Sequence, residues 1–352
     1  MENKACNEVV TVANMPMTVF DMISAMQNKY ADRVAFRYVE GKDRVVEKTY
    51  AQYVQDIRKA TGYLQQELGE PKGKKIVILS RTNYEYGAVV FGTMMAGAVI
   101  VTLNQGKTWA ELEHELGMVE PDLIFNDGID YGYRAQLEAL YGARLRPMDA
   151  WTAAPEAEMV NRIDHEGLLM LMFTSGTTGE PKMVAHDFTY PLGHIVTGSF
   201  WHNLNEESLH LTIADTGWGK AVWGKLYGQW IAGANVFVYD HEKFTPAAIL
   251  EKIQDYHVTS LCAPPTIFRF LIHEDLTKYD LSSLEYCTIA GEALNPAVFE
   301  TFKKLTGIII VACYNCFFCI ALHLFNISIT LIQFPLAFCL FCHHRSCLCF
   351  YF

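Results

Sequence analysis

Nine consecutive residues, Thr174 to Lys182, carry the side chains with the clearest capacity for chemistry in this sequence. Two glycines allow backbone conformations in which successive N–H groups converge on one anion. The hydroxyl side chains add donors, and the lysine supplies a compact positive charge for phosphate oxygens. The residues concerned are Thr174, Ser175, Gly176, Thr177, Thr178, Gly179 and Lys182. This string predicts a phosphate-binding loop, and the alternative is a solvated Ser/Thr/Gly hairpin loop.

The flanking residues set this loop apart from the common phosphate motif in which a glycine precedes the lysine and a helix follows it. Here Pro181 precedes Lys182, and residues 183–186 have the pattern of a strand. The apolar run 168–173 leads into the loop and is also typical of a strand. We therefore expect the loop to connect two strands.

Short apolar runs recur between predicted helices along the first half of the chain. Runs without polar alternation are typical of strands buried on both faces, and hence of a largely parallel sheet covered by helices. The runs are 76–79, 98–103, 123–125 and 168–173, and residues 34–39 and 45–49 have the pattern of a hairpin.

Three helix starts are marked by a threonine three residues before a side chain that can reach back to it. The pairs are Thr18 with Asp21, Thr49 with Gln52, and Thr108 with Glu111. This is the capping-box pattern or a close relative of it. Together with the apolar runs, it predicts an α/β fold.

Residues 174–182 resemble the phosphate-binding loop of the AMP-forming adenylating enzymes, which include acyl-CoA synthetases, luciferases and peptide-synthetase adenylation domains. Residues 214–219 (Ala-Asp-Thr-Gly-Trp-Gly) resemble the acyl-pocket segment of the acyl-CoA synthetases, especially the medium-chain branch. Residues 290–294 resemble the adenine-side loop of the family. Other segments in register are 49–52, 92–103 and 262–266, and the resemblance covers about residues 18–307.

This resemblance implies the large N-terminal domain of the adenylate-forming family, with mostly parallel sheets covered by helices and incomplete at its C-terminus. It also implies a two-step reaction. A carboxylate attacks the α-phosphorus of ATP and releases pyrophosphate, and the thiol of coenzyme A then takes the acyl group from the acyl-adenylate. ATP, Mg²⁺ and coenzyme A are the cofactors and cosubstrates so implied, with a carboxylic acid as substrate.

The resemblance also assigns roles to individual residues. Thr174 to Gly179 and Lys182 would hold the ATP phosphates, and Trp218 with Gly219 would shape the acyl pocket. The adenine side would be lined by Gly291, Glu292, Ala293 and Leu294. Each assignment has an alternative: Trp218 as a core aromatic, Gly219 as a turn residue, and Glu292 on the surface of a helix that opens near Pro296.

The sequence changes character after Gly307. From residue 308 to 352 the only formally charged residue is Arg345, and this segment holds seven of the ten cysteines. The family's aromatic-Gly-x-Thr-Glu segment, its ribose-binding aspartate, its hinge and the lysine of its small C-terminal domain find no match. We therefore expect a partial adenylation domain over residues 1–307 and an atypical tail over 308–352, and we assign no catalytic residue.

Three interpretations of this tail remain. A shifted reading frame or read-through is favoured by the abrupt switch to Phe, Cys, Ile and Leu. A membrane anchor is less favoured, although residues 308–325 are just long enough to span a bilayer. A metal module is least favoured, because Cys313, Cys316 and Cys319 stand among large apolar residues, unlike the ligands of zinc sites.

Charge and cysteine content restrict the class of function. The net charge of −11 argues against a main role in gripping nucleic acid, which needs clustered Lys and Arg. Three scattered cysteines before Gly307 are typical of a reducing compartment, and no secretory signal is recognised, so we expect a cytoplasmic protein. No metal site is expected, since the histidines lack ligand spacing and are interpreted as structural or exposed: His165, His186, His194, His202 and His210.

The sequence therefore predicts an acyl-CoA synthetase-type ligase for a carboxylic acid, with a medium-chain fatty acid favoured, whose activity is impaired in this chain. The alternatives are a non-catalytic nucleotide- or acyl-binding protein and a membrane-tethered protein in which the loop is a relic.

Overall fold

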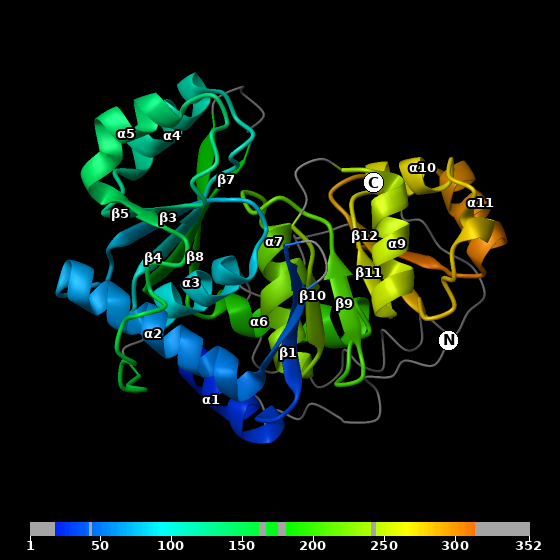
Figure 1. Cartoon of the computed structure of the whole chain (residues 1–352), viewed down its shortest axis with the longest axis horizontal. Helices are drawn as coiled ribbons and strands as arrows, with labels where there is room; N and C mark the ends of the chain where they lie inside the picture. The colour runs from blue at the N-terminus through cyan, green and yellow to red at the C-terminus, as the bar shows by residue number, and fades with distance from the viewer. Residues whose placement is uncertain (1–17, 42–43, 162–166, 175–180, 241–243, 314–352) are drawn as a thin grey trace.

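The structure is a computed structural model of the whole chain, and the description covers residues 18–41, 44–161, 167–174, 181–240 and 244–313. Within these residues two sheets lie side by side, with helices between them and on both outer faces (Figure 1). The seven-stranded sheet runs in the order β13 (Ile310–Cys313), β12 (Tyr286–Ala290), β11 (Ser260–Cys262), β9 (Leu209–Thr212), β10 (Asn235–Val238), β1 (Val34–Glu40) and β2 (Arg44–Thr49). The six-stranded sheet runs in the order β6 (Leu145–Pro147), β5 (Leu123–Asn126), β3 (Lys75–Leu79), β4 (Val99–Thr102), β7 (Leu168–Thr174) and β8 (Lys182–Asp187).

The strand pairs confirm the prediction of mostly parallel sheets. In the described chain, only the hairpins β1·β2 and β7·β8 pair antiparallel, and the other neighbours are parallel. The central strands are buried on both faces, as in Ile76–Leu79 and Val99–Thr102. Continuous apolar runs are the sequence form of such strands.

The helices divide into three layers. The layer between the sheets holds α1 (Val19–Tyr30), α2 (Tyr50–Leu68), α3 (Tyr84–Met95), α6 (Tyr190–Val196), α7 (Lys220–Val222) and α8 (Gly228–Ala232), with π-helical turns at Thr197–Trp201 and Trp223–Tyr227. The outer face of the six-stranded sheet is covered by α4 (Trp109–Val119) and α5 (Arg134–Tyr141), followed by a short 3₁₀ turn at Gly142–Arg144. The outer face of the seven-stranded sheet is covered by α9 (Pro246–Tyr256), α10 (Pro265–Leu271) and α11 (Pro296–Thr306), with a 3₁₀ turn at Leu276–Lys278.

The three predicted helix starts are confirmed. Complete capping boxes open α2, with Thr49 and Gln52, and α4, with Thr108 and Glu111. In α1 the Thr18 hydroxyl accepts a hydrogen bond from the Asp21 backbone N–H at 2.9 Å. Each cap satisfies backbone donors that the first turn leaves without a partner.

The seven-stranded sheet continues past Gly307, the predicted end of the adenylation domain. Strand β13 pairs parallel to β12 with Cys287 opposite Ile310. Ile308 and Ile310 are buried in the core under α11. The first residues of the apolar run therefore form an edge strand of the sheet that packs Ile310 into the core, since β-branched side chains suit a pleated surface.

No helix in the described ranges combines the length and apolar character needed to cross a membrane.

Candidate nucleotide and acyl site

The predicted phosphate loop is carried by the hairpin of β7 and β8. Thr174 lies opposite Lys182 in the antiparallel register, and both residues are exposed at the end of the hairpin that the loop connects. Before Thr174, strand β7 is anchored by the buried residues Leu169 to Met172. The loop residues Ser175, Gly176, Thr177, Thr178 and Gly179 lie outside the described residues. The strand predicted at 183–186 is confirmed by β8.

The acyl-pocket segment, defined as residues 214–219, follows β9 of the seven-stranded sheet and contacts loops of the six-stranded sheet. The Thr216 hydroxyl donates to the Ser80 carbonyl, just after β3. The Thr82 hydroxyl donates to the Ala214 carbonyl at 3.2 Å. A Cβ placed on Gly217 would lie 2.3 Å from the backbone nitrogen of Asn104, just after β4. The carboxyl ends of strands from both sheets therefore meet at this segment, the place where ligands bind in open α/β folds.

A substitution at Gly217 tests its close approach to the Asn104 backbone. We expect Gly217→Ala to lower the free energy of unfolding by about 1–3 kcal/mol, because the new methyl group meets rigid backbone. The control is Gly117→Ala in α4, where a Cβ has open space and an alanine favours the helix. Urea unfolding of both variants measures the effect, and an unchanged stability for Gly217→Ala would contradict the close approach.

Trp218 and Gly219 continue the segment toward the phosphate hairpin. Trp218 is 61% exposed, so the alternative that it is a core aromatic is wrong. A Cβ on Gly219 would lie 3.0 Å from the Met172 sulfur and 3.2 Å from the Trp223 indole nitrogen. Gly219 therefore lies against Met172, which is two positions before Thr174 at the end of β7.

The adenine-side loop, defined as residues 291–294, follows β12. Gly291 has φ +102°, a conformation that L side chains rarely adopt, so the chain turns sharply as the strand ends. Glu292 is exposed and lies 3.8 Å from Arg269, and this ion pair is solvent-screened. The helix opening predicted near Pro296 is confirmed, since α11 starts there with Asn295 as its N-cap. Glu292 precedes that helix and is not part of it.

Two buried lysines in this region, Lys220 and Lys225, are not among the site residues predicted from the sequence. The Lys220 ammonium donates to the Ala290 carbonyl at 2.6 Å, which joins the acyl-pocket segment to the end of β12. The Lys225 ammonium lies 3.2 Å from the Thr82 hydroxyl, and burial lowers its pKa to about 7. The sequence signal that could have found them is a lysine on each side of the uncharged residues 221–224.

A buried polar cluster lies behind the site and contains two of the histidines. His210 Nε2 is 3.0 Å from the Gly224 carbonyl and must donate to it, so Nδ1 accepts from the Ser260 hydroxyl at 2.9 Å. His202 Nδ1 is 3.0 Å from the Thr288 hydroxyl. Burial lowers the pKa of His210 to about 4 and that of His202 well below its usual value. These rings are neutral core groups at pH 7.

No group of three or more His, Cys, Asp or Glu side chains is arranged to hold a metal ion in the described part of the chain. His165 lies outside that part.

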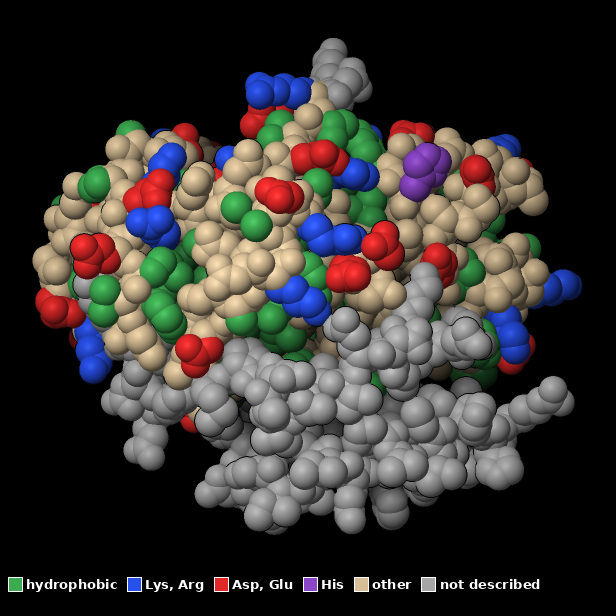
Figure 2. All heavy atoms as spheres, turned by 90° about the horizontal axis from the view of Figure 1, so that it is seen from below, with side chains coloured by type: hydrophobic (Ala, Val, Ile, Leu, Met, Phe, Trp, Pro, Cys, Tyr) green, Lys and Arg blue, Asp and Glu red, His purple; other side chains and the backbone are tan. Residues whose placement is uncertain are grey.

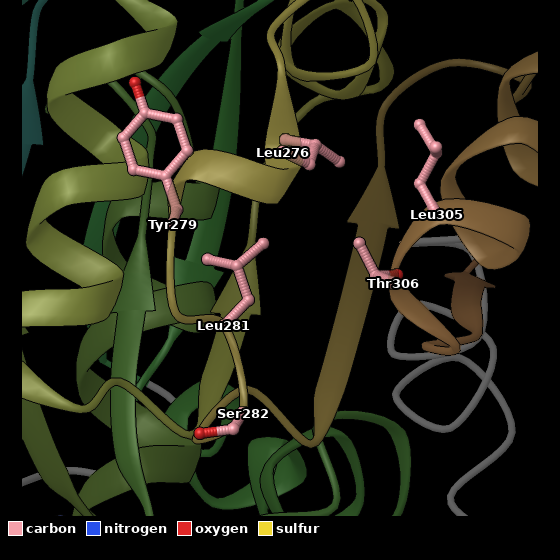
Figure 3. A pocket seen from close by; sticks show the side chains of 6 residues that line it. All are labelled: Leu276, Tyr279, Leu281, Ser282, Leu305 and Thr306. Carbon is pink, nitrogen blue, oxygen red and sulfur yellow. The ribbon is translucent and has the colours of Figure 1, made fainter.

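One cavity lies away from this site. It has a volume of about 230 Å³ and is lined by Leu276, Tyr279, Leu281, Ser282, Leu305 and Thr306 (Figure 3). Ser282 and Thr306 precede β12 and β13, so the cavity is at the amino ends of these parallel strands. The loops described above are at the carboxyl ends. The cavity carries no carboxylate, lysine or histidine and is separate from the candidate site.

The comparison with protein families agrees with this geometry. The family model described as "AMP-binding enzyme" matches residues 24–316, and the chain belongs to that family. The matched region includes β13, beyond the boundary at Gly307.

The curated relatives that match this chain include acyl-coenzyme A synthetases. The chain is 28% identical over 297 residues to acyl-coenzyme A synthetase ACSM3, mitochondrial, of Rattus norvegicus, covering 80% of this chain and 51% of that protein. It is 31% identical over 291 residues to human acyl-coenzyme A synthetase ACSM5, mitochondrial, covering 78% of this chain and 50% of that protein. The chain thus spans about half the length of the curated relatives it matches.

Solved structures share the fold. A Brucella canis acyl-CoA synthetase matches with a TM-score of 0.71 and 23% identity, covering 82% of this chain and 56% of that one. The anthranilate CoA ligase AuaEII in complex with anthranoyl-AMP matches with a TM-score of 0.74 and 22% identity, covering 90% and 61%. The predicted fold, the large domain of adenylate-forming enzymes, is confirmed.

Proposed function

We propose that this chain is the nucleotide- and acyl-binding part of an AMP-forming acid–CoA ligase, an acyl-CoA synthetase. The observation that carries the proposal is the convergence of three segments at one edge. The β7–β8 hairpin, the acyl-pocket segment and the adenine-side loop are joined by the contacts of Gly219 with Met172 and of Lys220 with Ala290. Family membership supports the same conclusion.

The chemistry of this reaction matches the residues at that edge. A carboxylate oxygen bonds to the α-phosphorus of ATP while the bond to the β-phosphate oxygen breaks, so pyrophosphate leaves. Coenzyme A thiol then bonds to the acyl carbon, and AMP departs. Reactions at phosphorus depend on positioning and charge stabilisation rather than on a protein nucleophile. Thr174 and Lys182 fit the leaving phosphates, because a residue with a hydroxyl and a residue with an ammonium are register partners at the loop end of the hairpin.

The donor set fits ATP better than it fits Mg²⁺. Gly291 to Leu294 would line the adenine, and Trp218 with Gly219 would line the acyl chain. The only adenine-side carboxylate, Glu292, is exposed and paired with Arg269. Mg²⁺ would therefore arrive with the nucleotide and supply charge neutralisation between its phosphates. We propose a medium-chain fatty acid as the substrate, on the resemblance of residues 214–219.

A second candidate is binding of nucleotide and acyl group without turnover. It is favoured by the absence of an aromatic-Gly-x-Thr-Glu segment after Gly307 in this sequence. Pyrophosphate release from ATP and octanoate distinguishes the two candidates, and partition of the chain into detergent tests the membrane-tethered alternative.

Partners and location are part of the proposal. On the face that Figure 2 shows, Lys and Arg side chains are interspersed with Asp and Glu rather than gathered in a basic patch, which supports a small-molecule ligand over nucleic acid. We propose a cytoplasmic location, supported by Cys262 and Cys287, which are buried thiols that form no disulfide. The ACSM relatives are named as mitochondrial, so fractionation of cells that express the tagged chain is the test.

Lys182→Ala tests the phosphate assignment. We expect it to weaken ATP and pyrophosphate binding about 10- to 100-fold, because one charge-assisted contact is worth about 1.5–3 kcal/mol. The control is Lys72→Ala, an exposed lysine before β3 at the opposite end of the strands. Calorimetric titration of the three proteins with ATP and with pyrophosphate gives the affinities. Equal affinities for all three would remove the hairpin from the site.

A further inference from the structure

We propose that Lys220 is a positioning residue that fixes the acyl-pocket segment (residues 214–219) against the adenine-side loop (residues 291–294). The inference rests on the proposed function and adds a residue to it. In the proposed function, the acyl group of an acyl-adenylate binds the acyl-pocket segment and its adenine binds the adenine-side loop. The distance between these two segments therefore decides whether the substrate carboxylate meets the α-phosphorus.

Lys220 joins the two segments by a direct contact. Lys220 opens α7, directly after Trp218 and Gly219, and its ammonium donates to the carbonyl of Ala290 at 2.6 Å. Ala290 is the last residue of β12, and Gly291 turns the chain away from the sheet with φ +102°. A hydrogen bond at this point holds the base of the adenine-side loop. The two residues are 70 positions apart, so the bond ties separate segments together.

The side chain of Lys220 is buried. Lys220 is only 9% exposed, and taking an ammonium out of water is costly unless strong acceptors replace the water. Gly224, which has no side chain, leaves space for the Lys220 stem. A Cβ on Gly224 would lie 3.1 Å from Lys220 Cγ, so a larger residue there would press on the lysine stem. A lysine held in this way is a rigid spacer between the two segments.

Lys225, five residues further on, differs from Lys220 in its contact. That lysine is also buried, but its ammonium contacts Thr82, on the loop after β3 of the other sheet. Lys225 therefore has no contact with the adenine-side loop among the hydrogen bonds of the described residues. The pair provides a matched control, because each change to methionine removes one buried ammonium from the same helical segment.

The experiment measures how strongly the two half-sites act together. The unaltered 352-residue chain, Lys220→Met and Lys225→Met are titrated by calorimetry with AMP, with octanoate and with octanoyl-sulfamoyl-adenosine, which joins both parts. We expect Lys220→Met to lose about tenfold or more in affinity for the joined ligand, because misplacement of linked groups is costly. Its affinities for AMP and octanoate should change much less, and Lys225→Met should keep the wild-type ratio.

The outcomes separate the two proposals. Failure of the wild-type chain to bind any of the three ligands overturns the proposed function and, with it, the positioning role. Wild-type binding combined with an unchanged Lys220→Met, or with equal losses for all three ligands, overturns the positioning role alone. Hydrogen exchange without ligand is the second measurement. Exchange over residues 286–294 should rise in Lys220→Met and not in Lys225→Met, and Lys220→Gln replaces the methionine variant should that variant fail to fold.

Discussion

Lowering the pH from 7 to 5 is expected to cost the folded chain about 5 kcal/mol of unfolding free energy, because three buried histidines must be protonated on unfolding. Burial lowers the pKa of His194 to about 3 and that of His210 to about 4, and the pKa of His202 falls well below its usual value. Neighbouring rings add to the effect, since His186 acts on His194 and His210 acts on His202.

The sign follows from the proton count of the two states. Each folded-state pKa lies below the unfolded value of about 6.5, so the unfolded chain binds more protons between the two values. The stabilisation is therefore fully present above about pH 6.5 and is lost as the pH falls toward 4 and 3. Each histidine contributes at most about 1.4 kcal/mol per pH unit within that window.

Urea unfolding at pH 7, 6 and 5 checks this expectation. His194→Gln removes one titrating ring and can keep a hydrogen bond to Thr197, so it should reduce the pH dependence by about one third. The control is the exposed His273→Asn, which should leave the slope unchanged. A wild-type chain equally stable at pH 5 and 7 would show that these rings are hydrated or already charged in the folded state.

The sequence predicted the parts of the fold that depend on near neighbours. Capping boxes at Thr49 and Thr108 act over three residues, and the apolar runs of β3 and β4 mark strands buried on both faces. The stem of the phosphate hairpin, Thr174 and Lys182, follows from the same local pattern. These features are visible in sequence because a short segment encodes each of them.

The sequence did not predict the contacts that assemble the site. Two contacts join segments far apart in the chain: the close packing of Gly217 on Asn104 and the hydrogen bond from Lys220 to Ala290. A single sequence carries no record of such pairs, and a lysine in a helix is by default assigned to the surface. The edge strand β13 was missed for a related reason, since its apolar residues continue without interruption into the tail.

Lys225 is the other group whose charge state is expected to control stability. It is 2% exposed, and burial lowers its pKa to about 7 even though the Asp215 and Asp240 carboxylates act in the opposite direction. The unfolded value is 10.5, so the unfolded chain binds more protons between pH 7 and 10.5. The penalty for burying Lys225 is therefore greatest below pH 7 and shrinks as the pH rises toward 10.5.

Lys225→Met is expected to raise the unfolding free energy by about 1–4 kcal/mol at pH 7, because an apolar side chain of similar length replaces a poorly paired buried ammonium. Thr82 is not left unsatisfied by the change, since its hydroxyl still donates to the Ala214 carbonyl. The gain should shrink by about 1.4 kcal/mol per unit as the pH rises from 7 to 9, where wild-type Lys225 is already neutral in the folded chain. Urea unfolding of both proteins at pH 7, 8 and 9, beside the exposed-lysine control Lys72→Met, measures the difference. A loss of stability at every pH would mean that Lys225 is a net stabilising link between the two sheets, and that the cost of its burial is offset by its contacts.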